Sequence, residues 1–302
     1  MSVRARIAII WGLIGALVYA LLAAGGAQAQ ATATLIQEYS WTNPDHRFGG
    51  LSGIEMADDG SSLTAVSDRG TLWHGAIARN ESGAITKITP QFIARLKTSE
   101  NKPVRGVTAD SEGLAIAPDG TIYVSFEGIA RIAKYARADA IAERIPRLEA
   151  FKHLQDNSAL EALAIDPSGA LFTLPERSGG TNTPFPVWRF ANGAWTEPFT
   201  VPRDGDWLPV GADFGPDGKF YLLYRDFLGI LGFRTKIMRY TIDGDTISVG
   251  ETLLETGGGR YDNFEGISVW RDAAGTLRVT LIADDNYAFY LRSEIAEFRI
   301  TE

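Results

Sequence analysis

A pattern of two strand-like runs joined by a glycine turn occurs five times along this chain of 302 residues. The turns read "DDG", "PDG", "PSG", "PDG" and "AAG", and they supply residues that tolerate a positive φ angle between antiparallel strands. One anchor position recurs in every copy, as Gly53, Gly113, Ala162, Gly211 and Gly266. Because regular internal repeats are the signature of repeat architectures, the pattern predicts a fold built from five similar units.

Most of these units continue with two more strand-like runs. The additional runs are 71–78 and 88–97, 130–137 and 147–154, 186–193 and 195–202, and 235–242 and 247–255. The last unit has only one, at 293–300, and the segment 33–41 supplies its missing strand. The sequence therefore predicts an all-β fold, a β-propeller of five four-stranded blades closed by pairing of the N- and C-terminal strands. A sixth blade in the long interval between Gly53 and Gly113 is the alternative.

Residues 1–29 have the pattern of a targeting segment, which leaves 30–302 as the propeller domain. The segment has a basic start at Arg4 and Arg6, a long apolar stretch, and an Ala-Gln-Ala sequence at 27–29 that fits a cleavage site. We expect a cleaved signal peptide and a periplasmic or secreted protein, assuming a bacterial source. The alternative is an uncleaved anchor in the inner membrane, with the propeller facing the periplasm.

Composition excludes several classes of function. The absence of cysteine excludes disulfides, thiolate nucleophiles and zinc–cysteine sites, and three histidines are too few for a histidine-rich metal site. There is no GxSxG elbow for a serine nucleophile. A net charge of −8 does not suit nucleic acid as a partner, because phosphate binding needs a basic face. We expect a monomer that meets a membrane only if residues 1–29 are retained.

Acidic residues recur at both ends of the predicted hairpins. They are Glu112, Glu161 and Glu265 at the start of the first strand, and Glu127, Glu176 and Asp284 at the end of the second. Blades one and four hold Ser52 and Val210 at the first of these positions, and they carry Glu55 and Asp213 three positions later. Because the first strands of a propeller line its channel in one orientation, we expect the recurring acids to converge around one mouth.

Several carboxylates in one place repel each other unless they are protonated or neutralised. Calcium suits such a group, since it takes six to eight oxygen ligands in a loose geometry. The candidate metal ligands are therefore Glu112, Glu127, Glu161, Glu176, Glu265 and Asp284. Arg69 lies beside Asp68, Arg177 beside Glu176 and Arg225 beside Asp226, at the ends of the second strands, and guanidinium groups match phosphate and carboxylate geometry. These three arginines, together with Glu161 as a proton acceptor, are the candidate catalytic residues.

The same residues have a structural interpretation. The glutamates would accept hydrogen bonds from backbone amides between blades, and the arginines would only pair with acids of neighbouring blades.

The sequences "DSEGLAIAPDG" (110–120), "ALEALAIDPSG" (159–169) and "NFEGIS" (263–268) resemble the phytase-like family, also called the esterase-like activity of phytase family. The resemblance spans roughly residues 47–300. It implies a propeller-like fold with recurring Glu and Asp residues, and hydrolysis of phosphoesters or phosphodiesters. Its acidic positions correspond to the six candidate metal ligands named above. Blade four departs from this pattern with Val210 and Arg225, so the ring of carboxylates is incomplete.

Three functions are compatible with these features. The leading hypothesis is an exported, calcium-dependent hydrolase that acts on a small anionic phosphate ester. A lactonase or carboxylesterase of the gluconolactonase type would use the same layout with a neutral substrate. A non-catalytic propeller would bind a ligand or partner without turning it over.

Overall fold

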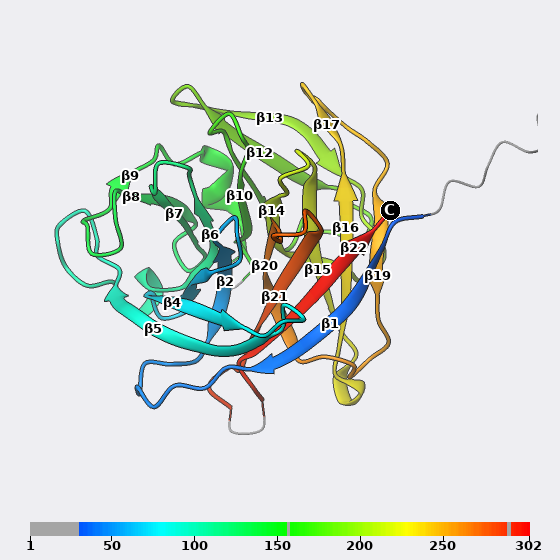
Figure 1. The fold of residues 1–302 in the computed structure, drawn as a ribbon. Coiled ribbons are helices and arrows are strands. Elements are labelled where there is room, and N and C mark those ends of the chain that lie inside the picture. The colour runs from blue at the N-terminus through cyan, green and yellow to red at the C-terminus, as the bar shows by residue number, and fades with distance from the viewer. Residues whose placement is uncertain (1–29, 156–157, 289–290) are drawn as a thin grey trace, which may run out of the picture. The chain divides into compact units, whose positions relative to one another are not determined.

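Five four-stranded antiparallel sheets follow one another along the chain and surround a common axis as the blades of a propeller (Figure 1). The computed structural model describes residues 30–302 except 156–157 and 289–290, so the predicted targeting segment 1–29 lies outside the described residues. No helix in the described part of the chain is long and apolar enough to cross a membrane. The prediction of a five-bladed propeller is confirmed, and the six-bladed alternative is wrong.

The blades have the following strands. Blade one contains β2 (Leu51–Met56), β3 (Ser62–Ser67), β4 (Thr71–Arg79) and β5 (Ile85–Arg95). Blade two contains β6 (Ser111–Ile116), β7 (Ile122–Phe126), β8 (Arg131–Tyr135) and β9 (Glu143–Arg144). Blade three contains β10 (Leu160–Ile165), β11 (Leu171–Pro175), β12 (Phe185–Ala191) and β13 (Ala194–Val201). Blade four contains β14 (Leu208–Phe214), β15 (Phe220–Phe227), β16 (Phe233–Tyr240) and β19 (Glu251–Glu255). Blade five contains β20 (Asn263–Arg271), β21 (Leu277–Asp284), β22 (Glu294–Thr301) and β1 (Thr32–Ser40).

Short elements fill the connections between these strands. The two-residue strands β17 (Ile242–Asp243) and β18 (Thr246–Ile247) form a separate hairpin after β16. Three 3-10 helices occur in the described residues: η1 (Gly106–Thr108), η2 (Glu149–His153) and η3 (Gly229–Leu231).

Blade five is closed by strands from both ends of the chain. β1 pairs antiparallel with β22 from Thr32 opposite Thr301 to Ser40 opposite Glu294, and Figure 1 shows the two strands side by side in blue and red. The Gln37 side chain also exchanges two hydrogen bonds with the backbone of Ile85 in blade one. The predicted closure is therefore confirmed, and it covers an edge that β22 would otherwise expose.

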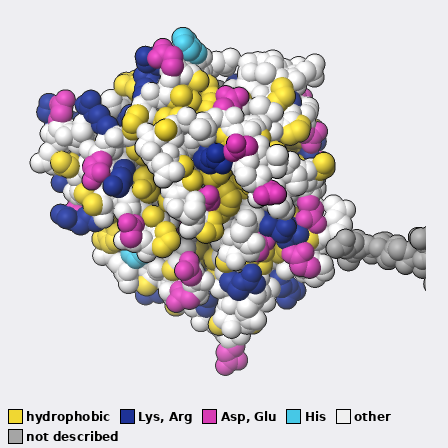
Figure 2. All heavy atoms as spheres, turned by 90° about the horizontal axis from the view of Figure 1, so that it is seen from above, with side chains coloured by type: hydrophobic (Ala, Val, Ile, Leu, Met, Phe, Trp, Pro, Cys, Tyr) yellow, Lys and Arg dark blue, Asp and Glu magenta, His cyan; other side chains and the backbone are white. Residues whose placement is uncertain are grey.

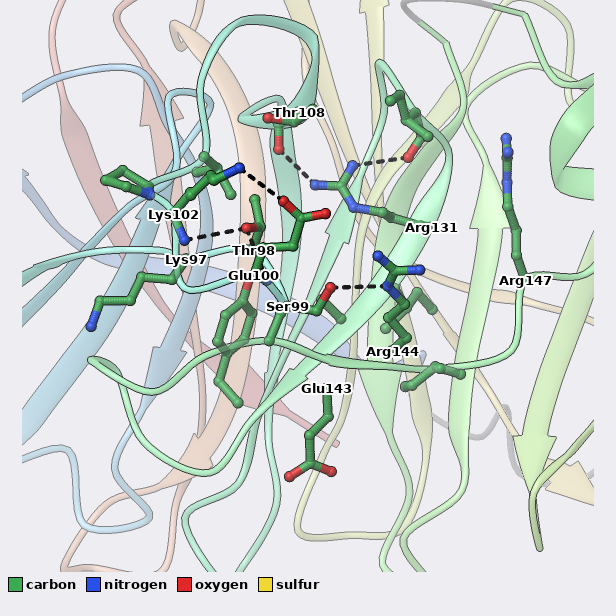
Figure 3. A pocket seen from close by; sticks show the side chains of 18 of the residues that line it. Lys97, Thr98, Ser99, Glu100, Lys102, Thr108, Arg131, Glu143, Arg144 and Arg147 are labelled. Atoms are coloured by element: carbon green, nitrogen blue, oxygen red, sulfur yellow. Dashed lines mark hydrogen bonds and ion pairs between the residues drawn. The ribbon is translucent and has the colours of Figure 1, made fainter.

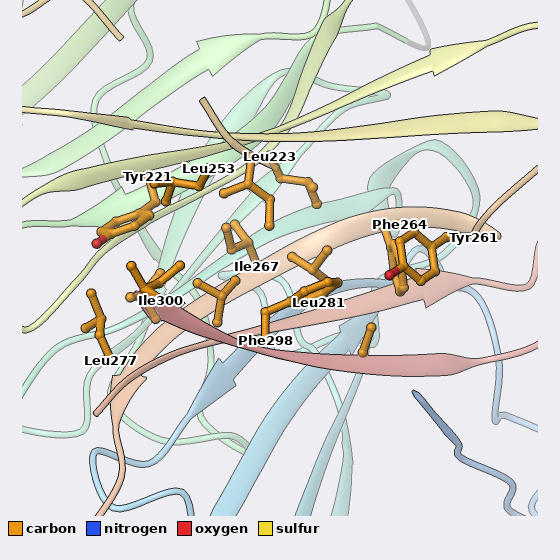
Figure 4. Close-up of a cluster of buried hydrophobic side chains, with 14 of the residues drawn as sticks. Tyr221, Leu223, Leu253, Tyr261, Phe264, Ile267, Leu277, Leu281, Phe298 and Ile300 are labelled. Carbon is orange, nitrogen blue, oxygen red and sulfur yellow. The ribbon is translucent and has the colours of Figure 1, made fainter. Parts of the chain in front are cut away.

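The hydrophobic core is divided into five clusters, each buried between two neighbouring blades. In the cluster between blades four and five, Leu223 of β15 packs with Ile267 of β20, Leu281 of β21 and Phe298 of β22 (Figure 4). The other four clusters repeat this arrangement around the ring. They lie between blades five and one, one and two, two and three, and three and four. Stability thus comes from face-to-face packing of sheets, and the central axis is left for polar groups.

The innermost strand of every blade contains a β-bulge at the anchor position of the repeat. Register shifts occur at Gly53, Gly113, Ala162, Gly211 and Gly266 or at the residue next to them. At Gly113 an added Cβ atom would lie 2.6 Å from the carbonyl oxygen of Glu161 in the next blade. At Gly211 it would lie 2.5 Å from the carbonyl oxygen of Glu265. The glycines therefore allow close approach of neighbouring inner strands at the bulge.

The outer part of blade two differs from the prediction. The segment 147–154 was expected to be its fourth strand, but the structure forms η2 there and places the short strand β9 at Glu143–Arg144. Leu148, Phe151 and Leu154 face the core at spacings of three residues, which match a 3-10 turn. Phe151 is the buried centre of this group and packs edge-on against Trp188 and Trp195 of blade three. Packing against blade three therefore favours a 3-10 helix over a strand in this segment.

Candidate functional site

The inner hairpin of each blade brings two functional positions to one mouth of the channel. The residue before the anchor lies at the bulge of the inner strand: Ser52, Glu112, Glu161, Val210 or Glu265. The residue at the end of the second strand lies beside it: Asp68, Glu127, Glu176, Arg225 or Asp284. In blade two the backbone amide of Glu127 donates to the carbonyl of Asp110, which holds the strand ends together at 2.8 Å. Regular antiparallel pairing thus places residues about 15 positions apart in the same site.

These positions line a cavity of about 460 Å³. Eight carboxylates line it: Asp68, Asp110, Glu112, Glu127, Glu161, Glu176, Glu265 and Asp284. All six candidate metal ligands named from the sequence are in this group. Among the candidate catalytic residues, Glu161, Arg177 and Arg225 line the cavity. Arg69 does not line it, and its guanidinium group instead stacks on the ring of Tyr287 at 3.4 Å.

Burial and mutual repulsion raise the pKa values of the acids in the cavity. Burial, followed by the charges of Glu265 and Glu127, raises the pKa of Glu112 well above its usual range. Burial, followed by the charges of Glu112 and Glu176, does the same for the pKa of Glu161. The cavity therefore favours proton binding or cation binding.

Two carboxylates at the ends of the second strands show the same effect. Burial raises the pKa of Glu127 to about 7 although the Ala159 amide donates to it. Burial and the charge of Glu265 raise the pKa of Asp284 to about 8. Both groups would therefore exchange protons near neutral pH in the absence of a cation.

Three of these carboxylates are placed to share one cation. Asp110, Glu112 and Glu127 each offer an oxygen atom, and the three atoms lie within 4.8 Å of one another. Calcium ligands lie about 2.3–2.6 Å from the ion, so ligand atoms on opposite sides are about 5 Å apart. The oxygen-only donor set and its spacing therefore fit Ca²⁺. In the described part of the chain, no backbone amide donates to Glu112, which leaves its carboxylate available.

Arg225 balances the opposite side of the cavity. Its guanidinium group donates to Glu176 at 2.9 Å and to Asn263 at 2.7 Å, and it also pairs with Glu265. Asn263 completes the network by donating to Glu265 at 2.7 Å. These carboxylates raise the pKa of Arg225 despite its burial, so the side chain stays charged. Glu176 and Glu265 thus share one cationic partner from the chain itself, which sets them apart from the three-oxygen group.

Arg177 is the more accessible arginine of the cavity. Its side chain is 49% exposed, lies 3.5 Å from Glu176 and donates to the Ser158 hydroxyl at 3.1 Å. A half-exposed guanidinium group with unused donors can reach an anionic ligand without leaving its neighbours.

Glu55 and Asp213 do not join this mouth. They lie at the other end of the inner strands, in a separate cavity beside the hairpin turns. Asp213 accepts from the Val269 amide of the next blade at 2.6 Å, and Glu55 accepts from the amide of Ile116. At the same repeat position, Ser268 accepts from the Met56 amide at 3.0 Å. These side chains therefore connect neighbouring inner strands.

Sequence reasoning missed Asp110 and Asn263 as site residues. Both occupy the position three residues before the anchor, where the other blades hold Gly50, Ala159 and Leu208. An acid that occurs once in five repeats gives no repeat signal, so only the fold could reveal it. The apolar rim of the cavity was also missed: Phe227 and Phe233 line it and their ring centroids lie 4.8 Å apart.

Comparison with known protein families gives a match over most of the chain. The family described as "Phytase-like: Esterase-like activity of phytase" matches residues 46–287, which is most of the chain. The chain belongs to the phytase-like family. The resemblance predicted from the sequence is thus confirmed. No curated protein sequence matches this phytase-like chain.

Solved structures with the same general fold are distant in sequence. The PQQ-bound aldose sugar dehydrogenase from Streptomyces coelicolor has 12% identity and a TM-score of 0.50, covering 90% of this chain and 99% of that one. An α-L-arabinofuranosidase from Podospora anserina has 11% identity and a TM-score of 0.50, covering 90% of this chain and 97% of that one. At this identity, the likeness of the phytase-like propeller to these proteins concerns the fold alone.

Proposed function

We propose that this phytase-like propeller is an exported, calcium-dependent hydrolase of small phosphate esters. The observation that carries the proposal is the group of three carboxylate oxygens from Asp110, Glu112 and Glu127 within 4.8 Å of one another. The group lies in a cavity where burial raises carboxylate pKa values, so a cation would relieve a real electrostatic cost. The family description supports ester hydrolysis.

The residues of the cavity divide into distinct roles. Asp110, Glu112 and Glu127 would hold the ion. When bound there, calcium would offset the negative charge of a phosphoryl group and polarise it. Glu161 would accept the proton of the attacking water, since its raised pKa makes it a stronger base than an exposed glutamate. Arg177 would contact the anionic group of the substrate, because it is half exposed.

Arg225 would act as a positioning residue. Its donors already hold Glu176, Glu265 and Asn263, so it fixes the wall of the cavity. We assign Arg69 no part in the chemistry because it stacks on Tyr287 outside the cavity lining.

The metal is tested first by thermal unfolding of the chelator-treated protein with and without Ca²⁺ or Mg²⁺. A ligand that binds only the folded chain raises the midpoint of unfolding by mass action. We expect a rise with Ca²⁺ that Glu112→Gln or Glu127→Gln removes. Glu81→Gln is the matched control, since Glu81 is an exposed turn residue and the change in charge is the same. No shift with either ion would contradict the calcium site and leave a binding propeller.

Hydrolysis is tested with p-nitrophenyl phosphate and bis-p-nitrophenyl phosphate in the presence of Ca²⁺. Removing a general base typically costs about 10²–10⁴-fold in rate, so we expect such a loss in kcat for Glu161→Gln. Arg177→Gln should mainly raise KM, because its contact would be with the substrate anion. Turnover of a neutral lactone without turnover of phosphate esters would instead support the lactonase hypothesis.

A further inference from the structure

A second, larger cavity lies on the outer side of blades one and two. It has a volume of about 690 Å³, and it shares no lining residue with the carboxylate-lined cavity. The connection from β5 to β6 forms one wall, and β8, β9 and the residues up to Arg147 form the other. Its size is in the range of cavities that bind small organic molecules.

The charge of this cavity is opposite to that of the chain. Six cationic side chains line it: Lys97, Lys102, Arg105, Arg131, Arg144 and Arg147. Only two carboxylates, Glu100 and Glu143, line it, and each already pairs with a lysine at 3.1 Å. The chain as a whole has a net charge of −8. Figure 2 shows acidic and basic side chains interspersed over one face of the molecule. The excess of positive charge in the cavity is therefore local and is not a property of the whole surface.

Within the described residues, no carboxylate forms an ion pair with the arginines of the cavity; Asp110 affects Arg131 and Glu100 affects Arg144 only at longer range. Arg131 donates to the carbonyls of Thr108 at 2.6 Å and Ile129 at 3.0 Å, and Arg144 donates to the Ser99 hydroxyl at 3.0 Å. Figure 3 shows Lys97 and Lys102 on one side of the cavity and Arg131, Arg144 and Arg147 on the other. A guanidinium group has five N–H donors, so most donors of these arginines are free for an anion.

The floor between the charged side chains is apolar. Ile129, Ile145 and Pro146 offer accessible apolar surface in the cavity, and the buried Val104, Ile132 and Tyr135 line it together with Ala133 and Ala142. β8 already pairs with β9 at Ala133 and Lys134, so the floor offers no continuous free edge to which an extended peptide could add. Cationic side chains around an apolar floor suit a molecule that has an apolar body and an anionic head.

We propose that this cavity is a binding site for a small amphiphilic organic anion, with its head held by Arg144, Arg147 and Arg131 and its body on the floor formed by β8. The proposal does not depend on the reaction at the carboxylate-lined cavity. The head is a carboxylate, sulfonate or phosphate, which are the groups that match guanidinium geometry.

Calorimetric titration of the full chain with 4-phenylbutyrate tests the proposal. We expect saturable binding to one site. The neutral amide of the same compound should bind at least about tenfold more weakly, because it lacks the charge-assisted hydrogen bonds. Acetate, which lacks the apolar body, should show no saturable binding. Equal binding of the acid and the amide, or no saturable binding of the acid, would overturn the proposal.

Substitutions of lining residues test whether the anion binds in this cavity. The double variant Arg144→Gln/Arg147→Gln should weaken binding of 4-phenylbutyrate at least about tenfold, since each removes a cationic donor. Lys87→Gln/Lys219→Gln is the matched control: it removes the same charge from residues that do not line the cavity. Ala142→Leu should also weaken binding by occupying part of the floor, with an unchanged unfolding midpoint as the check on folding. Binding that follows net charge alone, equal in the two double variants, would count against the site.

Discussion

Arg225 occupies in blade four the position that carries an acid in each of the other blades. The equivalent residues are Asp68, Glu127, Glu176 and Asp284. A fifth carboxylate there would have left Glu176 and Glu265 without their shared cation. The departure from the repeat therefore divides the ring of acids into a side on which two carboxylates share Arg225 and a side on which a cation could bind to Asp110, Glu112 and Glu127.

Replacing Arg225 by Gln should destabilise the fold strongly. The side chain is only 18% exposed, and its loss leaves Glu265 without an ion pair and Glu176 with only the longer one to Arg177 at 3.5 Å. Breaking a buried ion pair by removing one partner typically costs about 3–5 kcal/mol, so we expect a loss of that size in the free energy of unfolding. Arg177→Gln is the control: Arg177 is 49% exposed, and its loss should cost less than about 1 kcal/mol. Denaturant unfolding at pH 8 compares the two, and equal losses would contradict the role given to Arg225.

Single residues could be predicted from the sequence only where they repeat. Glu112, Glu161 and Glu265 follow a common register, so the hairpin geometry alone placed them together. Asp110 completes the three-oxygen group but occurs in one blade only. The carboxylates that pair with Arg225 are determined by distances across the channel. The order of strands along the chain does not give these distances.

The bulged inner strand is the element that positions the site. Each bulge turns one side chain toward the mouth while the strand continues to pair with its neighbour in the blade. The inner strands approach closely at this point, and a glycine or alanine is present at every anchor.

A methyl group at Gly113 should disturb this packing. Its Cβ atom would lie 2.6 Å from both the carbonyl oxygen of Glu161 and the Cβ atom of Leu163. Overpacking of this kind typically costs about 1–3 kcal/mol, and we expect Gly113→Ala to reduce the free energy of unfolding by at least that much. Gly257→Ala is the control, because nothing lies within 4 Å of its added methyl group. If both variants unfold at the same denaturant concentration, close approach at the bulge is not a constraint.

The bounds of the inner strands near the axis could be predicted from the sequence, but the prediction of the outermost strand of blade two was wrong. Inner strands have turn residues at both ends and a repeated pattern, so their positions followed from the sequence. The segment 147–154 alternates polar and apolar residues over 147–150 as a strand would, but Leu148, Phe151 and Leu154 recur every three positions. Contact of Phe151 with Trp188 and Trp195 selects the second pattern, and these partners belong to the next blade.

Closure of the whole ring depends on a strand from the start of the chain. Without β1, blade five would expose the edge of β22 and lose the packing of Ala33 and Leu35 against its core. A chain that begins at residue 42 should therefore unfold at lower temperature and with a broader transition. Adding a peptide of residues 31–41 should restore the transition, and the same peptide with Leu35→Asp should restore it less. A truncated chain that melts like the intact one would contradict this account.

The stability of the metal-free protein should fall as pH rises from about 5 to 8. Burial raises the pKa values of Asp68 to about 6, Glu127 to about 7 and Asp284 to about 8, above those of the unfolded chain. Between the unfolded and folded pKa values the folded chain binds more protons, so their stabilising contribution is complete below pH 4 and is lost as pH rises through the folded values. Each excess proton corresponds to about 1.4 kcal/mol of unfolding free energy per pH unit. Acids whose pKa is lowered, such as Asp45, titrate below this window and do not oppose the trend.

Denaturant unfolding in the presence of chelator at pH 5, 6, 7 and 8 measures this slope. Glu161→Gln should reduce the slope, because it removes a buried acid whose pKa is raised and which adds to the charge on its neighbours. Saturating Ca²⁺ at pH 8 should restore much of the lost stability, since a cation takes the place of the protons. Stability that is constant or rises over this range would mean that the carboxylates of the mouth are ionised without cost, and the electrostatic argument for a bound cation would fail.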